Sequence, residues 1–423
     1  MNVRVPSHDR PALLGGKPVF AKPPPISWPP VDRRTEQDLR ALYRSRAWSW
    51  NGSWEQRMCA HLCRIHTAKH AIPMVNGTVT LEAALRALGV GRGDEVIVPA
   101  LTWIATALAA VCVGAKPVFV DIEPDSLCLD PAKAAEAVTP RTRAMIPVHL
   151  YGGMADMDRL LRLARKRGLK VIEDCAHAHG GLWAGRGLGS LGDFGSFSFQ
   201  QSKTVSGGEG GAVITNDARL AQRAFRYKHI GYEFGASQGK ASGGLPEDLL
   251  CRNYRGTEFS ALVIARQLEG LAALTRRRNA AADFFIRELE RIPGVKIQAR
   301  GRRATRGRQS YYAFVVILDL REWAGADLGR VLRALRMENV PIGRTYNSVY
   351  RHLLWNRPPS AYRIHGGYRD AKGPGCKVSE EVGWARSLCF PHGILDLPHS
   401  DLTRLAEALA KVQRRADRLS ALN

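Results

Sequence analysis

Short apolar runs alternate with helical patterns through the middle of the chain, and this alternation constrains the fold most strongly. Four runs have the length of buried strands, EVIVPA, KPVFVDI, AMIPVHL and LKVIEDCA, which begin at Glu95, Lys116, Ala144 and Leu169. The segments between them carry helical spacing, as in MDRLLRLARKRG from Met157. Because strands joined by helices run parallel, the pattern predicts a mostly parallel sheet with helices on both faces.

The remaining segments predict an extended arm and a second domain. Residues 1–30 are rich in proline and glycine and are expected to be extended. After the strand runs comes one long helical pattern, EFSALVIARQLEGLAALTRRRNAAADFFIREL, of the kind that joins a large α/β domain to a smaller one. We therefore predict a large domain over residues 31–274 and a small α+β C-terminal domain over residues 275–423.

The composition is that of an ordinary globular protein. Apolar residues make up 45% of the chain and charged residues 24%. No run approaches the roughly 18 apolar residues of a membrane helix, and the start, MNVRVPSHDRPALLGG, lacks the apolar core of a secretory signal. Eight cysteines are scattered along the chain, as is usual for reduced thiols. We therefore expect a cytoplasmic protein with no membrane partner.

A formal net charge of +23 raises the question of a nucleic-acid partner. The basic runs are short, such as RKR from Arg165 and RRR from Arg276, and no aromatic residues alternate with them to stack on bases. A solvated, arginine-rich surface with a site for an anionic ligand is therefore preferred, and nucleic acid stays a minor alternative. Cys59 and Cys63 lie near two histidines, but no second cysteine pair completes a zinc site, so no metal is predicted.

Lys203 has an unusual setting in the stretch SFQQSKTVSGGEGG, between the strand-like run FGSFSF and four glycines. A lysine that forms a Schiff base must lose its proton and must sit at a fixed point beside a pocket. A strand that ends just before Lys203 supplies the fixed point, and the glycines let the chain turn sharply. The alternative is a tight hairpin that carries an exposed lysine.

Three further signals accompany this lysine. Asp174 ends a predicted parallel strand in VIEDCAHAHG, where it can keep a pyridinium nitrogen protonated or merely cap the next helix. Gly77 and Thr78 open a helix whose free N–H groups can bind phosphate, unless Asn76 or Thr78 is a plain N-cap. Trp103 follows a strand end and can cover a flat ring or pack in the core. Their order along the chain is that of a pyridoxal phosphate aminotransferase domain.

The motifs closely resemble those of the sugar aminotransferases of the DegT/DnrJ/EryC1/StrS group, which have the aspartate-aminotransferase fold type I. The matching segments occur in order: NGT at Asn76, DEVIVPALTW at Asp94, VFVDI at Val118, VIEDCAHAHG at Val171, FSFQQSK at Phe197, GEGGAVITND at Gly208 and NYRGTEFSA at Asn253. The resemblance implies an enzyme with pyridoxal 5′-phosphate as cofactor. It also implies a homodimer with two composite active sites.

The resemblance further implies a role for each cofactor-binding residue. Lys203 forms the Schiff base, and Asp174 pairs with the pyridine nitrogen. His177 lies near the phenolic oxygen, and Trp103 covers one face of the ring. Asn253 reaches the phosphate of the cofactor in the neighbouring subunit. The phosphate in the same subunit is held mainly by main-chain N–H groups and a hydroxyl, from Gly77, Thr78, Val79 and Ser198.

Three positions bear on the substrate. Gln200 stands where many nucleotide-sugar members have histidine, and it is similar to the branch of glutamine-dependent scyllo-inosose and 2-deoxy-scyllo-inosose aminotransferases. The motifs ALLGGKPVF and SWPP are also similar to that branch. In the segment YNSVY, Ser348 and Tyr350 replace the proline and histidine of a Y-x-P-x-H loop that approaches substrate in relatives. Gln200, Tyr346 and Tyr350 are therefore the candidate substrate-binding residues.

The preferred hypothesis is a pyridoxal-phosphate-dependent aminotransferase. It moves an amino group, with L-glutamine the expected donor, to a keto-cyclitol or keto-sugar in aminoglycoside, secondary-metabolite or sugar biosynthesis. The alternatives are an aminodehydratase similar to 3-amino-5-hydroxybenzoate synthases, which share the FSFQ pattern, and a nucleotide-sugar aminotransferase. Related dehydratases carry histidine in place of the lysine, so Lys203 argues against that class. A basic binding protein associated with nucleic acid is a third hypothesis, which the intact set of cofactor residues disfavours.

Overall fold

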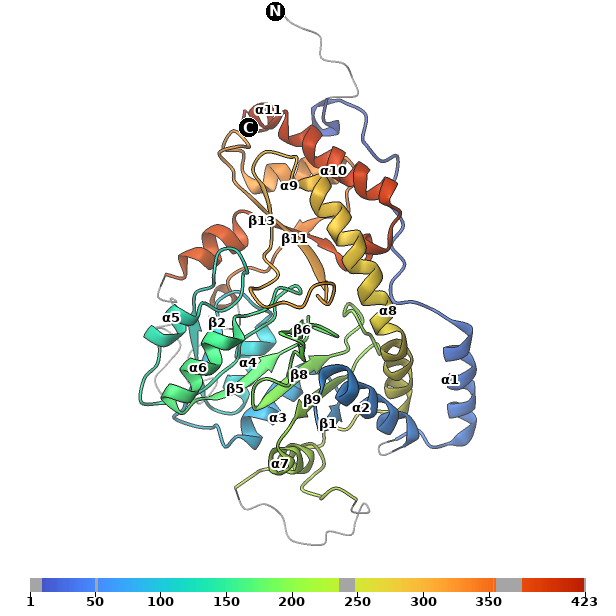
Figure 1. Ribbon diagram of the computed structural model, residues 1–423, viewed down its shortest axis with the longest axis vertical. Coiled ribbons are helices and arrows are strands. Elements are labelled where there is room, and N and C mark those ends of the chain that lie inside the picture. The colour runs from blue at the N-terminus through green and yellow to red at the C-terminus, as the bar shows by residue number, and fades with distance from the viewer. Residues whose placement is uncertain (1–9, 50–51, 236–247, 353, 355–374, 422–423) are drawn as a thin grey trace, which may run out of the picture.

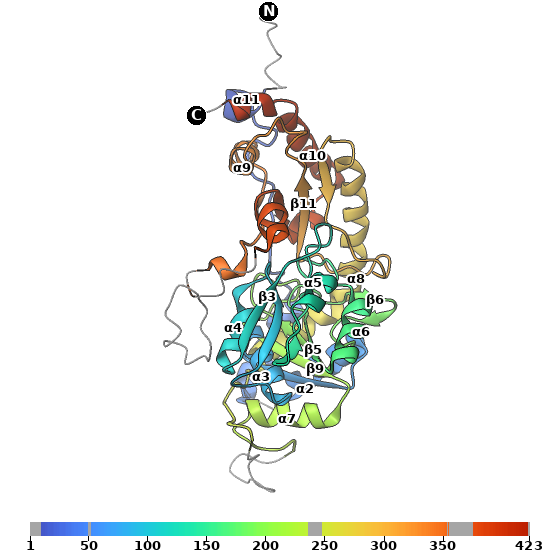
Figure 2. The ribbon, with the colours of Figure 1, turned by 90° about the vertical axis from the view of Figure 1, so that its left-hand side faces the viewer.

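Two sheets form two lobes in the computed structural model, which describes residues 10–49, 52–235, 248–352, 354 and 375–421. The long helix α8 (Glu258–Leu289) runs from one lobe into the other (Figure 1). Seen from the side, the smaller lobe stands above the larger one, and α7 (Ala218–Lys228) lies at the far end of the large lobe (Figure 2).

The large lobe is built on a seven-stranded sheet of order β1-β9-β8-β5-β4-β2-β3. β9 pairs antiparallel with both of its neighbours, and the other pairs are parallel. The strands are β1 (His70–Met74), β2 (Glu95–Pro99), β3 (Lys116–Val120), β4 (Thr142–Met145), β5 (Lys170–Asp174), β8 (Phe194–Ser198) and β9 (Gly211–Thr215). This mixed, mostly parallel sheet confirms the predicted fold class.

Helices cover both faces of this sheet because its strands are apolar on both sides. Ile97 belongs to one core cluster, whereas its neighbours Val96 and Val98 belong to the other. The first cluster includes residues of α8, α2 (Ser53–His66) and α6 (Met157–Arg167). The second includes residues of α7, α3 (Gly77–Ala87) and α4 (Ile104–Cys112). The remaining elements of this lobe are α1 (Arg33–Ser45), α5 (Pro131–Glu136) and a small hairpin of β6 (Leu182–Trp183) and β7 (Arg186–Gly187).

The small lobe has an antiparallel four-stranded sheet of order β10-β11-β13-β12. Its strands are β10 (Val295–Ile297), β11 (Ala313–Leu318), β12 (Gly343–Arg344) and β13 (Ser387–Pro391). Its helices are α9 (Leu328–Met337), α10 (His399–Gln413) and α11 (Ala416–Ser420). A third core cluster fills this lobe. Since α8 is continuous across residue 274, the exact division into residues 31–274 and 275–423 stays a prediction.

The N-terminal arm is anchored to the small lobe before it crosses to the large one. The Glu338 carboxylate accepts hydrogen bonds from the main-chain N–H groups of Ala12 (2.7 Å) and Val19 (2.8 Å). Lys411 Nζ donates to Glu338 (2.9 Å) and to the carbonyl of Lys17 (2.6 Å). The arm then passes beside α8 to reach α1 (Figure 1). Among the described helices, none has both the length and the apolar character needed to cross a membrane.

Candidate active site

A cavity of about 670 Å³, here called the lysine cavity, opens where the parallel strands of the large sheet end. Its walls come from the loops that follow β1, β2, β5 and β8, together with two tyrosines of the small lobe. The residues that carry its chemistry are Asn76, Gly77, Thr78, Thr102, Trp103, Thr106, Asp174, His177, Ser198, Gln200, Ser202, Lys203, Tyr312 and Tyr346. Ligands gather at this edge of open α/β sheets because the connecting loops diverge there.

Asp174 is the last residue of β5 and is fixed at the base of the lysine cavity. One carboxylate oxygen accepts a hydrogen bond from the Thr106 hydroxyl (2.9 Å), and the other accepts one from the N–H of Ala176 (3.1 Å). Burial raises the pKa of Asp174, and these two hydrogen bonds work in the opposite direction. Thr106 in turn contacts the hydroxyl of Thr102 (2.9 Å). Asp174 is thus held in place to accept a hydrogen bond from a protonated ring nitrogen.

Lys203 lies in the turn after β8 and is only 8% exposed, which excludes the alternative of an exposed lysine on a hairpin. Its main-chain N–H donates to the carbonyl of Gln200 (2.8 Å). Its Nζ lies 4.6 Å from the centre of the Tyr312 ring. Burial lowers the pKa of Lys203 to about 8, although the charge of Asp174 acts to raise it. A larger fraction of this amine is therefore unprotonated near neutral pH than of an ordinary lysine.

His177 presents a neutral ring with a defined tautomer. Its Nδ1 accepts a hydrogen bond from the N–H of Tyr151 (3.2 Å), so the proton is on Nε2. Burial lowers the pKa of His177 well below its usual value, and the charge of Lys203 adds to this effect. The ring stacks on that of Tyr312, with the ring centres 3.7 Å apart. His177 therefore offers an N–H donor, which suits a nearby anionic oxygen.

The start of α3 shows the helix cap that the sequence offered as the alternative to an open phosphate site. The side chain of Asn76 caps the helix and accepts the N–H groups of Thr78 (3.0 Å) and Val79 (3.1 Å), which we expected to hold a phosphate. To bind a phosphate, those two N–H groups would have to donate to the Asn76 side chain and to the phosphate at the same time. A Cβ at Gly77 would lie 2.5 Å from the Cβ of Ser198, so the helix start and the end of β8 approach closely.

The remaining predicted residues divide into two groups. Ser198, Gln200 and Trp103 line the lysine cavity, and the Trp103 ring lies 5.5 Å from that of Tyr346 with 55% of the residue exposed. Three others are not among the residues that line it: Val79, Asn253 and Tyr350. Asn253 is exposed, and the Tyr350 hydroxyl donates to Glu380. The roles predicted for these three stay predictions.

Glu173, the neighbour of Asp174, belongs to a separate buried network. Its carboxylate accepts N–H groups of the β7–β8 loop, at distances of 2.7–2.9 Å. It also contacts His149 Nε2 at 3.2 Å, while His149 Nδ1 accepts the N–H of Ala155. Glu173, His149 and Cys175 are near enough to share a metal ion. Because both ring nitrogens of His149 are engaged, the network is better described as hydrogen bonding that shapes the strand ends.

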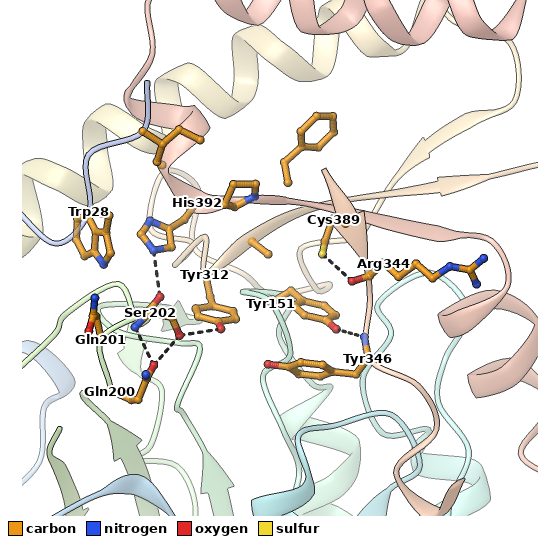
Figure 3. Close-up of a pocket in the computed structure, with 16 residues that line it drawn as sticks. Trp28, Tyr151, Gln200, Gln201, Ser202, Tyr312, Arg344, Tyr346, Cys389 and His392 are labelled. Atoms are coloured by element: carbon orange, nitrogen blue, oxygen red, sulfur yellow. Dashed lines mark hydrogen bonds between the residues drawn. The ribbon is translucent and has the colours of Figure 1, made fainter. Parts of the chain in front are cut away.

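A second cavity of about 610 Å³, here called the outer cavity, adjoins the lysine cavity on the side of the small lobe. The two cavities share Gln200, Ser202, Tyr312 and Tyr346. Gln200 Oε1 accepts both the N–H and the hydroxyl of Ser202 (2.8 Å each), and the Ser202 hydroxyl also contacts that of Tyr312 (3.2 Å). Figure 3 shows this chain of polar groups crossing the floor of the outer cavity.

Several residues of the site escaped the sequence reasoning. Thr106 stands at the start of the same helix as Trp103, so the strand-end signal that singled out Trp103 could have included it. Tyr312 directly precedes β11 and belongs to the strand-like run YYAFVVILDL, which carries no signal of a functional site. Trp28 and His392, which line the outer cavity, come from distant segments that only the folded chain brings together.

The residues of the lysine cavity fit pyridoxal phosphate. The chemistry of this cofactor needs a buried, partly unprotonated lysine, a carboxylate for the ring nitrogen and an aromatic surface for the ring. Lys203, Asp174 and Trp103 supply these three groups around one cavity. His177 adds an N–H donor for the phenolic oxygen.

Comparison with known proteins agrees with this geometry. The model of the DegT/DnrJ/EryC1/StrS aminotransferase family matches residues 30–363. A putative L-glutamine:3-amino-2,3-dideoxy-scyllo-inosose aminotransferase of Streptoalloteichus tenebrarius is 36% identical, and the match covers 96% of this chain and 99% of that one. The L-glutamine:2-deoxy-scyllo-inosose aminotransferase of Streptomyces kanamyceticus is 37% identical, over 96% and 97% of the two chains.

Solved structures agree on the fold. The crystal structure of 3-amino-5-hydroxybenzoic acid synthase is similar with a TM-score of 0.82 and 30% identity, and it matches 93% of this chain and all of that one. A structure of DesI with its TDP-sugar product has a TM-score of 0.81 and 28% identity, over 98% of each chain. These matches confirm the resemblance found in the sequence. The chain belongs to the DegT/DnrJ/EryC1/StrS aminotransferase family and is an aminotransferase that uses pyridoxal phosphate.

Proposed function

We propose that this aminotransferase moves the amino group of L-glutamine to the carbonyl carbon of a keto-cyclitol, in the biosynthesis of an aminocyclitol-containing secondary metabolite such as an aminoglycoside. The observation that carries the proposal is the near full-length similarity to two relatives whose names specify L-glutamine and inososes. Gln200, which lines both cavities, agrees with that branch of the family.

The polar groups of the outer cavity support an uncharged acceptor. Among the described residues that line it, Arg344 alone has a permanent charge. Its guanidinium carbon lies 4.8 Å from the centre of the Trp384 ring, and Figure 3 shows it directed away from Gln200 and Ser202. The hydroxyl and amide groups on the floor suit the hydroxyl groups of a cyclitol. None of them carries the positive charge that would favour a phosphate or a nucleotide.

The chain's own residues divide the work of the reaction. Pyridoxal phosphate, when bound, supplies an electron sink that stabilises a carbanion at the substrate carbon. Asp174 keeps the proton on the ring nitrogen, which that sink requires. Lys203 Nζ takes the proton from the donor Cα and, in the second half of the reaction, returns a proton to the former carbonyl carbon of the acceptor. His177 would hold the phenolic oxygen through its Nε2–H, and Trp103 would cover one face of the ring.

The phosphate is expected to lie at the start of α3, beside Gly77, Thr78, Val79 and Ser198. The helix dipole favours an anion there by about 0.3–1 kcal/mol, and by more in a partly buried position. Asn253 is exposed on its own subunit, and we propose that it reaches the phosphate site of a second copy in a homodimer. The large exposed fraction of Trp103, although it lines the cavity, supports an active site that a partner completes. Tyr346 and Tyr350 stay candidates for substrate binding.

A cytoplasmic location is also part of the proposal. All eight cysteines are free thiols, which is usual for proteins of a reducing compartment.

Incubation with a panel of acceptors tests the function. The purified enzyme would receive L-glutamine together with 2-deoxy-scyllo-inosose, scyllo-inosose or a nucleotide keto-sugar, and products would be identified by mass spectrometry. The proposal expects an amine only from the cyclitols. Amination of the nucleotide sugar alone would contradict it. The similarity to 3-amino-5-hydroxybenzoic acid synthase makes aromatisation of a cyclic precursor the second candidate, so a dehydrated aromatic product would favour that activity instead.

A further inference from the structure

The lysine turn, residues 200–208, joins β8 to β9 and is held only in part by its own main chain. The N–H of Lys203 donates to the carbonyl of Gln200 (2.8 Å), and that of Gln201 donates to the carbonyl of Gly208 (2.9 Å). The N–H of Gly207 donates to the carbonyl of Phe199 (2.8 Å). These bonds fix the two ends of the turn. The carbonyls of Ser202 and Lys203 instead find their partners in other parts of the molecule.

Two ring N–H groups from distant segments bind these successive carbonyls. The indole Nε1–H of Trp28 donates to the carbonyl of Lys203 (3.1 Å). His392 Nε2 lies 3.2 Å from the carbonyl of Ser202, and it must carry the proton because a carbonyl oxygen only accepts. Figure 3 shows the His392 bond to Ser202 with Trp28 beside it. The peptide groups on both sides of the Lys203 Cα are therefore held from outside the turn.

The two rings are themselves held in place. Trp28 and His392 meet edge to face, with ring centres 4.6 Å apart. The guanidinium carbon of Arg278 lies 4.9 Å from the centre of the Trp28 ring. Arg278 is 2% exposed and binds Asp396, which follows His392 in the same short helical segment. A buried cation thus backs the indole and ties the two rings to α8.

Trp28 and His392 also link Lys203 to the rest of the molecule. Trp28 belongs to the arm, which Glu338 and Lys411 anchor to the small lobe sixteen residues upstream, at Ala12. His392 follows β13, the strand next to β11 in the small sheet. Both lobes and the arm therefore determine where the main chain of Lys203 lies.

We propose that Trp28 and His392 are positioning residues, whose two N–H groups hold the main chain of Lys203 at a fixed point on the edge of the cofactor site. Over one complete reaction Lys203 would leave its bond to the cofactor once, in the first half, and re-form it once, at the end of the second half. A fixed Cα would then bring its Nζ back to the same carbon atom. This inference rests on the proposed catalytic role of Lys203.

Three variants test the contribution of the two N–H groups. Trp28→Phe removes the indole N–H and keeps an aromatic ring against Arg278. His392→Leu removes the donor to Ser202, whereas His392→Gln retains an N–H at a similar reach. Trp183→Phe is the matched control, because Trp183 Nε1 donates a bond of the same length (3.1 Å) to Asp158 and Trp183 lines neither cavity. Each variant is studied as the holoenzyme, by hydrogen–deuterium exchange of residues 198–211 and by steady-state kinetics with glutamine.

The proposal expects Trp28→Phe and His392→Leu to speed exchange in the lysine turn and to lower kcat about tenfold with KM within about twofold, as for the loss of one net hydrogen bond. His392→Gln is expected to show the exchange rate and kcat of the parent enzyme. Trp183→Phe is expected to change neither the exchange rate nor kcat. A rise in KM at unchanged kcat and exchange would show that Trp28 is only a cavity wall and overturn the proposal. Identical exchange rates in His392→Leu and His392→Gln would also overturn the proposal.

If Trp28→Phe fails to fold, the two His392 variants still test whether the N–H group holds the lysine turn. An enzyme inactive on every acceptor would contradict the proposed function, while the exchange data would still test the positioning role.

Discussion

At the scale of single residues, the site depends on two ionisable groups whose surroundings act on them in opposite ways. Burial lowers the pKa of Lys203 to about 8, so its amine is available as a nucleophile and as a base. Burial raises the pKa of Asp174, and the hydrogen bonds from Thr106 and Ala176 offset that rise and help to keep it ionised. The lysine cavity therefore supports a neutral amine and a charged carboxylate at the same pH.

The lowered pKa of Lys203 predicts how the cofactor-free protein takes up pyridoxal phosphate. Only the unprotonated amine attacks the aldehyde, so the rate of uptake should rise with pH through about 8 and then level off. For an ordinary lysine it would keep rising toward about pH 10. Absorbance of the bound cofactor measures the rate. Since the charge of Asp174 raises the pKa of Lys203, Asp174→Asn should move the midpoint to lower pH, and a shift to higher pH would contradict this assignment.

Thr106 offers a second prediction at this scale. Its hydroxyl lowers the pKa of Asp174, so Thr106→Val should raise that pKa and leave less of the carboxylate ionised. We expect kcat to fall by about fivefold to tenfold, as for one lost hydrogen bond, and the acid limb of the pH profile to move to higher pH. Thr106→Ser keeps the hydroxyl and should behave like the parent enzyme. Equal kinetics for the valine and serine variants would refute this role.

At the scale of elements, the strand ends place the catalytic groups, and the sequence predicted this part well. The runs EVIVPA and LKVIEDCA become β2 and β5, because short runs that are apolar on both faces suit strands covered by helices on both sides. The role of the start of α3 was harder to predict from the sequence, since a helix N-terminus can be capped by its own Asn76 or left open for a ligand. The contact between Trp28 and Lys203 joins residues far apart in the sequence, so no local pattern signals it.

The anchor of the N-terminal arm gives a prediction about stability. Glu338 and Lys411 form an ion pair whose side chains are 0% and 4% exposed. Glu338→Gln would leave the buried ammonium without its counter-ion, and removing one partner of such a pair costs about 3–5 kcal/mol. Urea denaturation measures the loss. Glu136→Gln, which breaks the exposed pair with Lys133, is the control and should leave the midpoint unchanged. Similar midpoints for the two variants would contradict the role given to the anchor.

At the scale of the whole molecule, the two lobes and the arm converge on one turn, and a second copy is proposed to complete the site. Lys203 comes from the large lobe, Tyr312 and His392 from the small lobe, and Trp28 from the arm. Asn253 is exposed, and the family resemblance implies that it reaches the phosphate site of the neighbouring subunit. The family could be identified from the order of motifs. The convergence of these segments could not be predicted from the sequence, since it depends on how the small lobe packs on the large one.

Mixed dimers test the shared site. Lys203→Ala should abolish activity, and Asn253→Asp should weaken it strongly by placing a negative charge near the phosphate. After the two variants are unfolded and refolded together, random pairing should restore about a quarter of the parent activity, because one site in each mixed dimer has both residues intact. If Asn253 acts within its own subunit, both sites of a mixed dimer are defective and mixing restores nothing.

The central claim is that Lys203 Nζ bonds covalently to pyridoxal phosphate, and reduction by borohydride tests it most directly. Reduction makes the bond permanent, and a proteolytic digest analysed by mass spectrometry then locates the added mass. We expect the phosphopyridoxyl group on the peptide that contains Lys203, and no adduct in Lys203→Ala. A protein that stays colourless with the cofactor, or an adduct confined to another lysine, would contradict the account.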